Sequence, residues 1–452
     1  MAALPKEIQY NKPMASLPSD TQMSQVIVRP SNGATFNGDG NIIQFDLPAH
    51  SFLVGSSLCL NLNIKIDPAA NTNVITMRGV PAASWIGRVE TIVGGSLLEA
   101  VSDYGRLYNM ISQTKLSFDE KAALQTEFGY GGGGVDGLAN VNPTLFNLNG
   151  RLGPTSAGTD GVAGTFPVSL PLGCMLSSCT ELIPLGHMGG VRIQITTAQV
   201  SEYIKSVLQS DDTSATPMPT MTFSDLELTF DLVDFGAGMD SVVRSMAVDG
   251  DLVLKSQGWN VTNVNFPVSA AATEATYIYN VRLSSIKSLF LQLTGEAGAD
   301  SVNKGYDAMR VGKSGQVQMF IANRPFPPTP LRETNTAAVK SALRQAFGGA
   351  HDIYSSRNSI TQKMWVDNAN LLDADATAST VTLPASHFYG INTEKLSSNQ
   401  VMLSGESSQL TPINVRVSTS EATANAATLT LYSCYDALIA LNVNSRQVAV
   451  RV

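Results

Sequence analysis

The sequence predicts an all-β protein built from two halves of similar size. Short runs of alternating apolar and polar residues recur along the chain, helical patterns are few, and only 15% of the residues are charged. Gly, Ala, Ser, Thr and Asn are abundant, which suits many short strands joined by turns better than helices with charged faces. A chain of 452 residues exceeds what one hydrophobic core usually serves, so two domains of roughly 200 residues each are expected.

The strands are predicted by period-two alternation, because successive side chains of a strand point to opposite faces of a sheet. In segment 58–66, leucine and isoleucine occupy every second position, while Cys, Asn and Lys fill the positions between them. One face of such a strand is buried and the other meets water. The same pattern predicts half-buried strands at 191–196, 225–232, 317–321, 413–417 and 448–452, so the last residue is expected in a strand.

Helices are expected to be few and short, each lying on a sheet or closing a loop. Apolar residues at i, i+3, i+4 and i+7 predict one over 104–111. Ser117 and Glu120 form a capping box, which predicts a second helix running towards Phe128.

A third helix and a single helical turn are predicted in the second half. An apolar stripe over 339–347 ends at Gly348, which is placed to stop a helix in the C′ position. Asp240 is the expected N-cap of one turn at 241–246. Because Phe235 to Gly238 precede this turn and are rich in glycine, we place the boundary between the two domains there.

The predicted organisation is an extended arm over 1–23, a first domain over 24–238 and a second domain over 239–452. The arm contains three prolines among mixed polar residues and shows no period. Within the domains, 129–165 form a glycine-rich insertion, and 366–380 are small and polar. Such segments emerge at one end of a β-sandwich, where they are free to meet partners or solvent.

Charge and hydropathy exclude several classes of protein. The net charge is -8 and no Lys/Arg tract exists, so direct binding to nucleic acid is disfavoured. No stretch of about 18 uninterrupted apolar residues occurs, and 1–23 lack the apolar core of a signal peptide, so synthesis without a secretory signal is expected. Four cysteines are too few for a disulfide framework and are expected to be reduced and mostly buried.

Patterns that could bind a cofactor or a metal are weak. Gly129 to Gly134 formally satisfy GxGxxG, but they follow a predicted helix and lead into more glycine, so a flexible loop is expected. Cys174, Cys179 and His187 supply three candidate ligands. Zinc sites usually have four ligands, in pairs more closely spaced along the sequence than these. We therefore predict no cofactor-binding or metal-binding residue.

Patterns that could carry catalysis are equally weak. No Gly-x-Ser-x-Gly elbow frames a serine, and the histidines are far apart in sequence, so no triad is predicted. Asp211-Asp212 are expected in a Ser/Thr-rich loop and Asp231 and Asp234 on an alternating strand, so both pairs are expected on solvated faces. The histidines are His50, His187, His351 and His387.

Three further features have ordinary interpretations. Trp85, Trp259 and Trp365 are scattered, which favours core packing over a stacking platform. The sequon at 260–262 is expected to be unused without a secretory signal. The proline-rich run 324–330 indicates a rigid extended connector, or equally a docking strip for a neighbour.

Segments in both halves carry a resemblance to a known family through their order and spacing. They are 27–48, 85–110 (with an Ile-x-Arg-Val-Glu strand before a Gly-Ser-Leu-Leu-Glu turn), 184–193, 387–392, 403–405 and 435–436. The chain thereby resembles the double jelly-roll major capsid proteins, above all those of polinton-like viruses and virophages. The likeness extends more distantly to those of large eukaryotic DNA viruses, adenoviruses and tailless phages. The glycine-rich insertion at 129–165 departs from the family's pattern. The family's external surface is therefore not expected in this chain.

The resemblance implies two consecutive eight-stranded antiparallel jelly-roll sandwiches, with a few short helices in the connecting loops. It implies a non-enzymatic structural protein of the virion, trimerising into pseudo-hexameric capsomers that tile an icosahedral shell around a double-stranded DNA genome. The implied partners are further copies of the chain, minor or cement capsid proteins, a penton protein and an internal membrane or membrane protein beneath the shell. No sequence-specific nucleic-acid contact is implied.

Two alternatives remain open at this point. The first is a minor capsid, vertex or spike protein built on the same sandwiches. The second is a carbohydrate-binding β-sandwich or glycosidase, which would need clustered aromatic residues or two well-placed carboxylates at a cleft.

Overall fold

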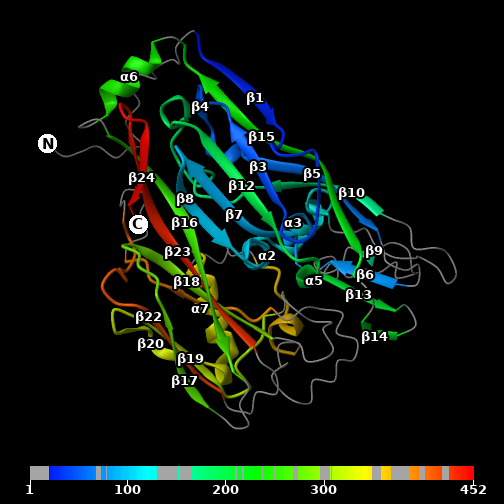
Figure 1. Cartoon of the computed structure of the whole chain (residues 1–452). Helices are drawn as coiled ribbons and strands as arrows, with labels where there is room; N and C mark the ends of the chain where they lie inside the picture. The colour runs from blue at the N-terminus through cyan, green and yellow to red at the C-terminus, as the bar shows by residue number, and fades with distance from the viewer. Residues whose placement is uncertain are drawn as a thin grey trace.

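The computed structural model of the chain consists mainly of antiparallel strands in two groups that lie side by side (Figure 1). Strands from residues 22–234 build three sheets, strands from 251–451 build two, and α6 (Met239–Met246) lies between the groups in sequence. The structure describes residues 20–67, 73–77, 79–129, 151–152, 164–208, 211–215, 218–236, 238–247, 251–267, 273–295, 306, 308–348, 358–367, 386–395, 403–419 and 427–451.

The largest sheet of the first half is built around the long strand β15 (Thr220–Asp234). Alternation along β15 buries residues such as Phe223 and Phe230, while Glu227 and Asp231 lie on the opposite face. A register shift between Ser224 and Glu227 interrupts the pairing with β5, as expected of a β-bulge. The other strands are β1 (Gln22–Val28), β2 (Thr35–Asn37), β4 (Phe52–Leu53), β5 (Cys59–Asp67), β10 (Gly164–Pro171) and β11 (Ile183–Pro184).

A second sheet completes the sandwich of the first half, with the strand order β3-β12-β7-β8. Its apolar face joins that of the first sheet in one core, and Trp85, just before β7, packs on Phe223 of β15 with ring centroids 4.5 Å apart. A third, smaller sheet has the order β14-β13-β6-β9. The strands are β3 (Ile42–Leu47), β7 (Ile86–Val93), β8 (Ser96–Ser102), β12 (Val191–Thr197), β6 (Asn73–Met77), β9 (Arg151–Leu152), β13 (Ile204–Leu208) and β14 (Asp211–Ala215).

The second half is organised around β23 (Ala427–Asn442), which is buried along almost its whole length. It pairs with β16 (Asp251–Phe266) on one side and, on the other, with β18 and then with the C-terminal β24. A facing sheet has the order β17-β22-β19-β20. The remaining bounds are β17 (Glu274–Tyr279), β18 (Ile286–Gly295), β19 (Gln316–Ile321), β20 (Arg324–Arg332), β21 (Tyr389–Asn392), β22 (Ile413–Ser418) and β24 (Gln447–Arg451).

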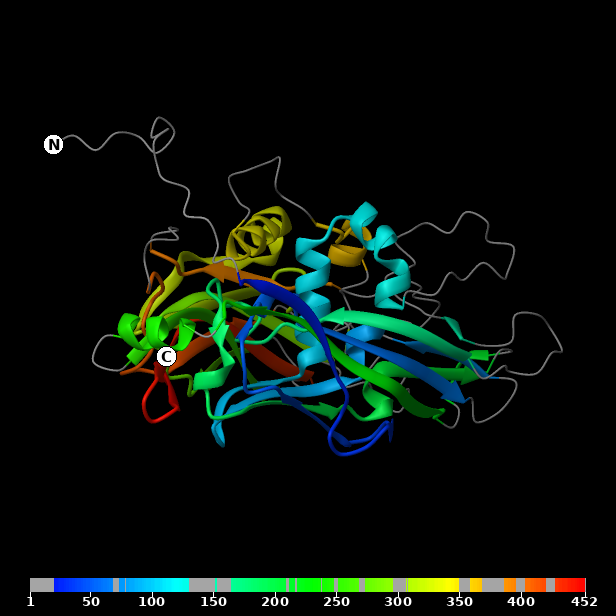
Figure 2. The ribbon, with the colours of Figure 1, turned by 90° about the horizontal axis from the view of Figure 1, so that it is seen from above.

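The helices are short and lie at the sheet surfaces, as Figure 2 shows for α7 beside the second group of strands. The predicted capping box is present, because Ser117 N donates to Glu120 Oε2 (2.8 Å) and Glu120 N donates to Ser117 Oγ (3.3 Å). The helices and helical turns are α1 (Pro81–Ser84), α2 (Tyr104–Lys115), α3 (Phe118–Ala123), α4 (Gln125–Phe128), α5 (Val200–Tyr203), α7 (Thr336–Ala346), η2 (Gly55–Ser57), η4 (Leu185–His187), η6 (Glu333–Asn335) and η7 (Lys363–Asp367).

The strand predictions are confirmed, and so is the all-β fold class. Each predicted alternating segment falls in β5, β12, β15, β19, β22 or β24, although Val452 itself lies outside the described residues. The third helix is also confirmed as α7, and Gly348 has a positive φ of 84° after its end. The cap of α7 is Asn335, whose side chain accepts a hydrogen bond from Ala338 N (3.1 Å).

Four details of the prediction were wrong. Asp240 lies inside α6, because the helix already begins at Met239. The run 324–330 is not a connector but part of β20, which occupies an edge of its sheet and can therefore contain prolines. Asp211-Asp212 begin β14 rather than lying in a loop, and β1 begins at Gln22, inside the predicted arm 1–23.

The predicted insertions fall largely outside the described residues. Of 129–165, the structure describes Gly129, β9 and the first two residues of β10. Of 366–380 it describes 366–367, at the end of η7. The position of the domain boundary remains a prediction.

Candidate assembly surfaces and the seam between the halves

A buried carboxylate, Glu99 of β8, connects the two halves. Its Oε1 accepts a hydrogen bond from Trp259 N of β16 (3.2 Å), and its Oε2 accepts one from Met175 N (2.5 Å). Burial raises the pKa of Glu99 to about 7, although both N–H groups favour the charged form. A carboxyl group contributed by the first half therefore fixes the backbone of the second.

Further buried hydrogen bonds cross the same seam. Tyr306 OH donates to Ser84 O (2.8 Å), and Ser359 N donates to Gln113 O (3.0 Å). In each pair, one residue comes from the first group of strands and helices and the other from the second half. Because buried polar groups are costly to leave unpaired, these bonds resist separation of the halves.

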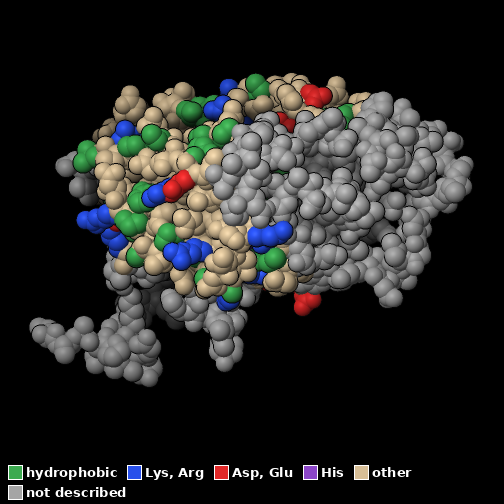
Figure 3. Space-filling view, turned by 90° about the horizontal axis from the view of Figure 1, so that it is seen from below, with side chains coloured by type: hydrophobic (Ala, Val, Ile, Leu, Met, Phe, Trp, Pro, Cys, Tyr) green, Lys and Arg blue, Asp and Glu red, His purple; other side chains and the backbone are tan. Residues whose placement is uncertain are grey.

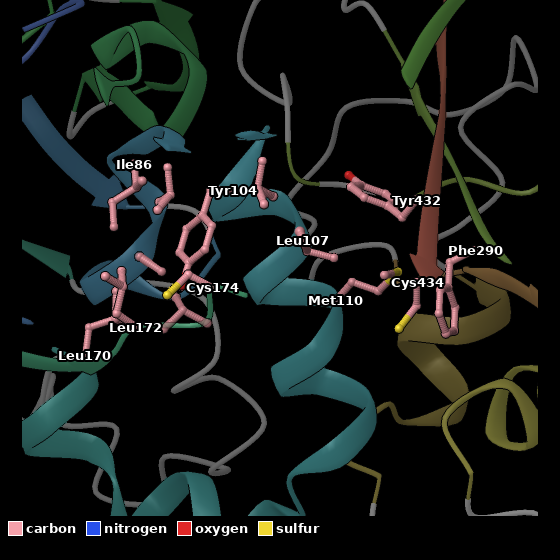
Figure 4. Packing of buried hydrophobic residues seen from close by; sticks show 14 of the residues in the cluster. Ile86, Tyr104, Leu107, Met110, Leu170, Leu172, Cys174, Phe290, Tyr432 and Cys434 are labelled. Carbon is pink, nitrogen blue, oxygen red and sulfur yellow. The ribbon is translucent and has the colours of Figure 1, made fainter. Parts of the chain in front are cut away.

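Helix α2 fills the apolar part of the seam. Figure 4 shows Leu107 and Met110 of this helix beside Phe290, Tyr432 and Cys434 of the second half. All five side chains belong to a single hydrophobic cluster that extends through both halves. The two sandwiches thus share a core and form one body.

A cavity of about 210 Å³ opens at the seam next to this core. Its lining includes Lys115 of α2, Trp259 of β16 and Phe347 at the end of α7. The Lys115 Nζ lies 5.8 Å from the centre of the Phe347 ring. Of the three tryptophans, Trp85 and Trp365 are buried, as predicted, whereas Trp259 is half-buried at this cavity.

The second half encloses a polar network around His387. Its Nδ1 lies 2.7 Å from Trp365 O, and its Nε2 lies 3.1 Å from Glu333 Oε1. Tyr389 OH donates to the same Glu333 oxygen at 2.6 Å and accepts from Val311 N at 3.0 Å. Histidine, glutamate and tyrosine can perform acid–base chemistry, but these three are fully buried, so the network holds the fold together instead of facing a substrate.

The other sequence candidates do not converge on a site. Cys174 and Cys179 are buried thiols, and burial raises the pKa of Cys174 to about 12 and that of Cys179 to about 11. His187 is buried at the end of η4, whereas His50 is exposed. Within the described residues, no group of three or more His, Cys, Asp or Glu side chains is arranged to hold a metal ion.

The remaining candidates are also accounted for, or lie beyond the described residues. Asp231 is half-buried on the outward face of β15, and Asp234 is exposed at the end of the strand. Asn260 is half-buried in β16, and its Oδ1 accepts from Thr262 Oγ1 (3.2 Å). His351 and the glycine run after Gly129 are outside the described residues.

Several sheets present apolar side chains to solvent. On the β17-β22-β19-β20 sheet, Ile278 is 63% exposed, beside a shallow hollow of about 540 Å³ whose lining includes Phe320. On the large sheet of the first half, Met23 and Ile27 of β1 are 66% and 56% exposed. Exposed apolar groups on otherwise polar faces are typical of surfaces that contact another chain. No helix in the described part of the chain combines the length and apolar character needed to cross a membrane.

Comparison with known proteins shows the fold. No family model matches the sequence, and no curated protein matches it either. The structure, however, is similar to the PBCV-1 virus capsid (10% identity, TM-score 0.58, covering 98% of this chain and 99% of that one). It is also similar to the Faustovirus major capsid protein (9%, 0.59, covering 96% and 92%) and the mavirus major capsid protein (10%, 0.53, covering 100% and 95%). The double jelly-roll fold that the sequence resemblance implied is thereby confirmed.

Proposed function

We propose that this chain is the major capsid subunit of a double-stranded DNA virus, and that three copies form a pseudo-hexameric capsomer that tiles an icosahedral shell. The observation that carries the proposal is the similarity of fold to viral major capsid proteins over almost the entire length of both chains. Because a fold by itself does not fix a function, the proposal also needs support from the molecule's own architecture.

The architecture supports the proposal through the seam. Each copy contains two similar sandwiches joined as one body, so a trimer contains six comparable sandwiches. The trimer can therefore contact six neighbouring capsomers. That geometry requires the sandwiches to keep a fixed relation, which Glu99, Tyr306 and the shared core around α2 provide. Exposed apolar residues on the outer faces of both halves leave surface for contacts between copies.

A structural, non-enzymatic role agrees with the placement of the reactive side chains. The His387 network and the thiols of Cys174 and Cys179 are buried and engaged in packing or hydrogen bonds. The chain would act in the virion, with other copies of itself, minor or cement proteins and a penton protein as partners. An internal membrane or membrane protein beneath the shell belongs to the same proposal.

The test is the mass of the purified chain in solution, measured by size exclusion with light scattering and followed by negative-stain imaging. The expected result is a trimer of the 47.9 kDa chain, about 144 kDa, with a hexagonal outline from above. A monomer at all concentrations would contradict the proposal, and a pentamer would indicate a vertex protein. In purified particles, the chain should be the most abundant protein; a minor share would indicate a cement or spike protein.

A further inference from the structure

The two halves differ in charge. Residues 1–238 contain 12 Lys/Arg and 21 Asp/Glu, whereas residues 239–452 contain 17 and 16, so the net charge is -9 in the first half and +1 in the second. A protein that is acidic overall therefore has one strongly acidic half and one nearly neutral half. Part of the difference lies on two sheets, the one that carries the exposed Ile278 and the one that carries the exposed Met23 and Ile27.

The strands of the β17-β22-β19-β20 sheet carry a net positive charge at exposed positions. Its strands contain three arginines, Arg324, Arg332 and Arg416, all exposed, and Glu274 is their only acid. Glu274 forms an ion pair with Arg416, and within the described part of the chain neither Arg324 nor Arg332 has a carboxylate partner. Figure 3, which views the molecule from the side where these strands lie in Figure 1, shows blue Lys and Arg side chains at several separate places on the described surface and fewer red ones.

The opposite charge lies on the large sheet of the first half. Strands β1 and β15 contain four acids, Asp225, Glu227, Asp231 and Asp234, and no Lys or Arg. Arg29, just after β1, forms an ion pair with Glu227 (3.0 Å), while no described cation pairs with the other three acids.

Apolar groups accompany the charges on both faces. In the β1–β15 ladder, Gln25 lies opposite Asp231, so the exposed Met23 and Ile27 flank the acidic row. On the arginine face, Arg416 itself lines the hollow of about 540 Å³ beside Ile278. On each sheet, exposed apolar side chains thus lie beside charged ones: acids of β15 in the first half, and Arg416 with its partner Glu274 at the hollow in the second.

We propose that the arginine face of one copy binds the acidic β1–β15 face of a second copy of this chain. The inference rests on the proposed self-assembly and specifies which surfaces meet. Because the two faces differ and belong to different halves, the contact is head-to-tail, and such contacts close into rings when the rotation between copies allows it. The charges set the register and the order of the copies, and the apolar groups supply the buried centre.

Charge reversal tests the contact. The double variant Arg324→Glu/Arg332→Glu should weaken self-association at least ~10-fold, because two like-charged faces then meet. Glu227→Lys/Asp231→Lys should do the same. The variant that combines all four substitutions has the net charge of the wild type and restores opposite charges across a head-to-tail contact, so its association should return to within ~3-fold of the wild type. Light scattering across a dilution series measures each dissociation constant.

A matched variant controls for net charge. Arg324→Glu/Arg332→Glu combined with Glu127→Lys/Glu181→Lys has the same net charge but places the lysines at exposed positions outside β1 and β15. It should remain as weakly associated as the arginine double variant. The wild-type complex should also weaken as NaCl is raised from about 50 to about 500 mM, a readout that needs no substitution.

The outcomes separate this inference from the proposed function. The head-to-tail contact is overturned if the wild type associates and the charge reversals have no effect. It is also overturned if the variant with all four substitutions does not associate. Either result leaves the capsid proposal standing. If the matched variant associates as strongly as the variant with all four substitutions, net charge alone controls self-association. That result also overturns the proposed contact. A wild type that never associates contradicts both.

Discussion

The Nε2 atom of His387 lies 3.1 Å from Oε1 of Glu333, and both side chains are fully excluded from solvent. The other ring nitrogen of His387 lies 2.7 Å from Trp365 O, so both nitrogens face acceptors. Each ring nitrogen therefore has a buried oxygen within hydrogen-bond distance, and the same Glu333 oxygen also accepts from Tyr389 OH. A buried pair of this kind is costly to break, because removing one partner leaves the other without compensation.

Replacing Glu333 with Ala should therefore destabilise the protein strongly. The variant removes the acceptor of both His387 and Tyr389, and the expected loss is about 3–5 kcal/mol in the free energy of unfolding, measured by urea denaturation. Glu333→Gln keeps an acceptor oxygen for Tyr389 and should lose less. A loss below about 1 kcal/mol for the Ala variant would show that the pair contributes little.

The seam should respond to pH through Glu99. Because burial raises its pKa from 4.5 to about 7, the folded state holds a proton that the unfolded state has released in this range. Stability contributed by this group is therefore present in full below pH 4.5, falls as the pH rises and is lost above about 7. The loss amounts to about 3 kcal/mol at most, by the free energy of a pKa shift of this size.

The measurement is urea denaturation at several pH values, with Glu99→Gln as the control. The amide has no charge to desolvate, so the variant should show a flatter stability profile between pH 4.5 and 7 than the wild type. Identical profiles for the two proteins would contradict a raised pKa at Glu99.

The packing of α7 on β21 should depend on Gly390. A Cβ at this position would lie 2.8 Å from Leu343 Cδ1 and 3.1 Å from Leu343 Cα, so the helix would have to shift. Gly390→Ala should cost about 1–3 kcal/mol of stability by thermal or chemical unfolding. Gly238→Ala is the matched control, because nothing lies within 4 Å of its Cβ and it should stay within about 0.5 kcal/mol of the wild type. Equal stability of the two variants would mean that α7 adapts freely.

Deleting residues 1–19 tests the arm. The deletion ends before β1 begins at Gln22, so the folded body and its trimers should be retained. Shell assembly should be weakened, because the arm predicted from the sequence is expected to bind across neighbouring capsomers. Assembly is measured by light scattering and electron microscopy. Unchanged assembly of the deletion variant would contradict a role for the arm.

Local patterns were sufficient for the strands and several helix ends. In β15, apolar and polar residues alternate because one face meets the core and the other meets water, and that demand is visible in the sequence itself. The Ser117–Glu120 box could be predicted for a similar reason, since both of its hydrogen bonds join residues three positions apart.

The buried polar sites could not be predicted from local sequence. Glu333 and His387 are 54 residues apart, and Glu99 and Trp259 are 160 apart, so only the folded chain brings each pair together. One signal was available for Glu99, which shares its side of β8 with the buried Val101. A carboxylate on the apolar side of a strand indicates a specific partner.

By itself, the sequence determined that the chain folds into two groups of half-buried strands, because alternation and turn chemistry act between residues close in the chain. Only the tertiary structure decided that the two groups share one core and that Glu99 bridges them. It alone placed arginines on one outer face and carboxylates on another. These features depend on which distant strands pair and in what register. Pairing and register are determined by burial of the apolar surface of the whole chain, which no local segment specifies.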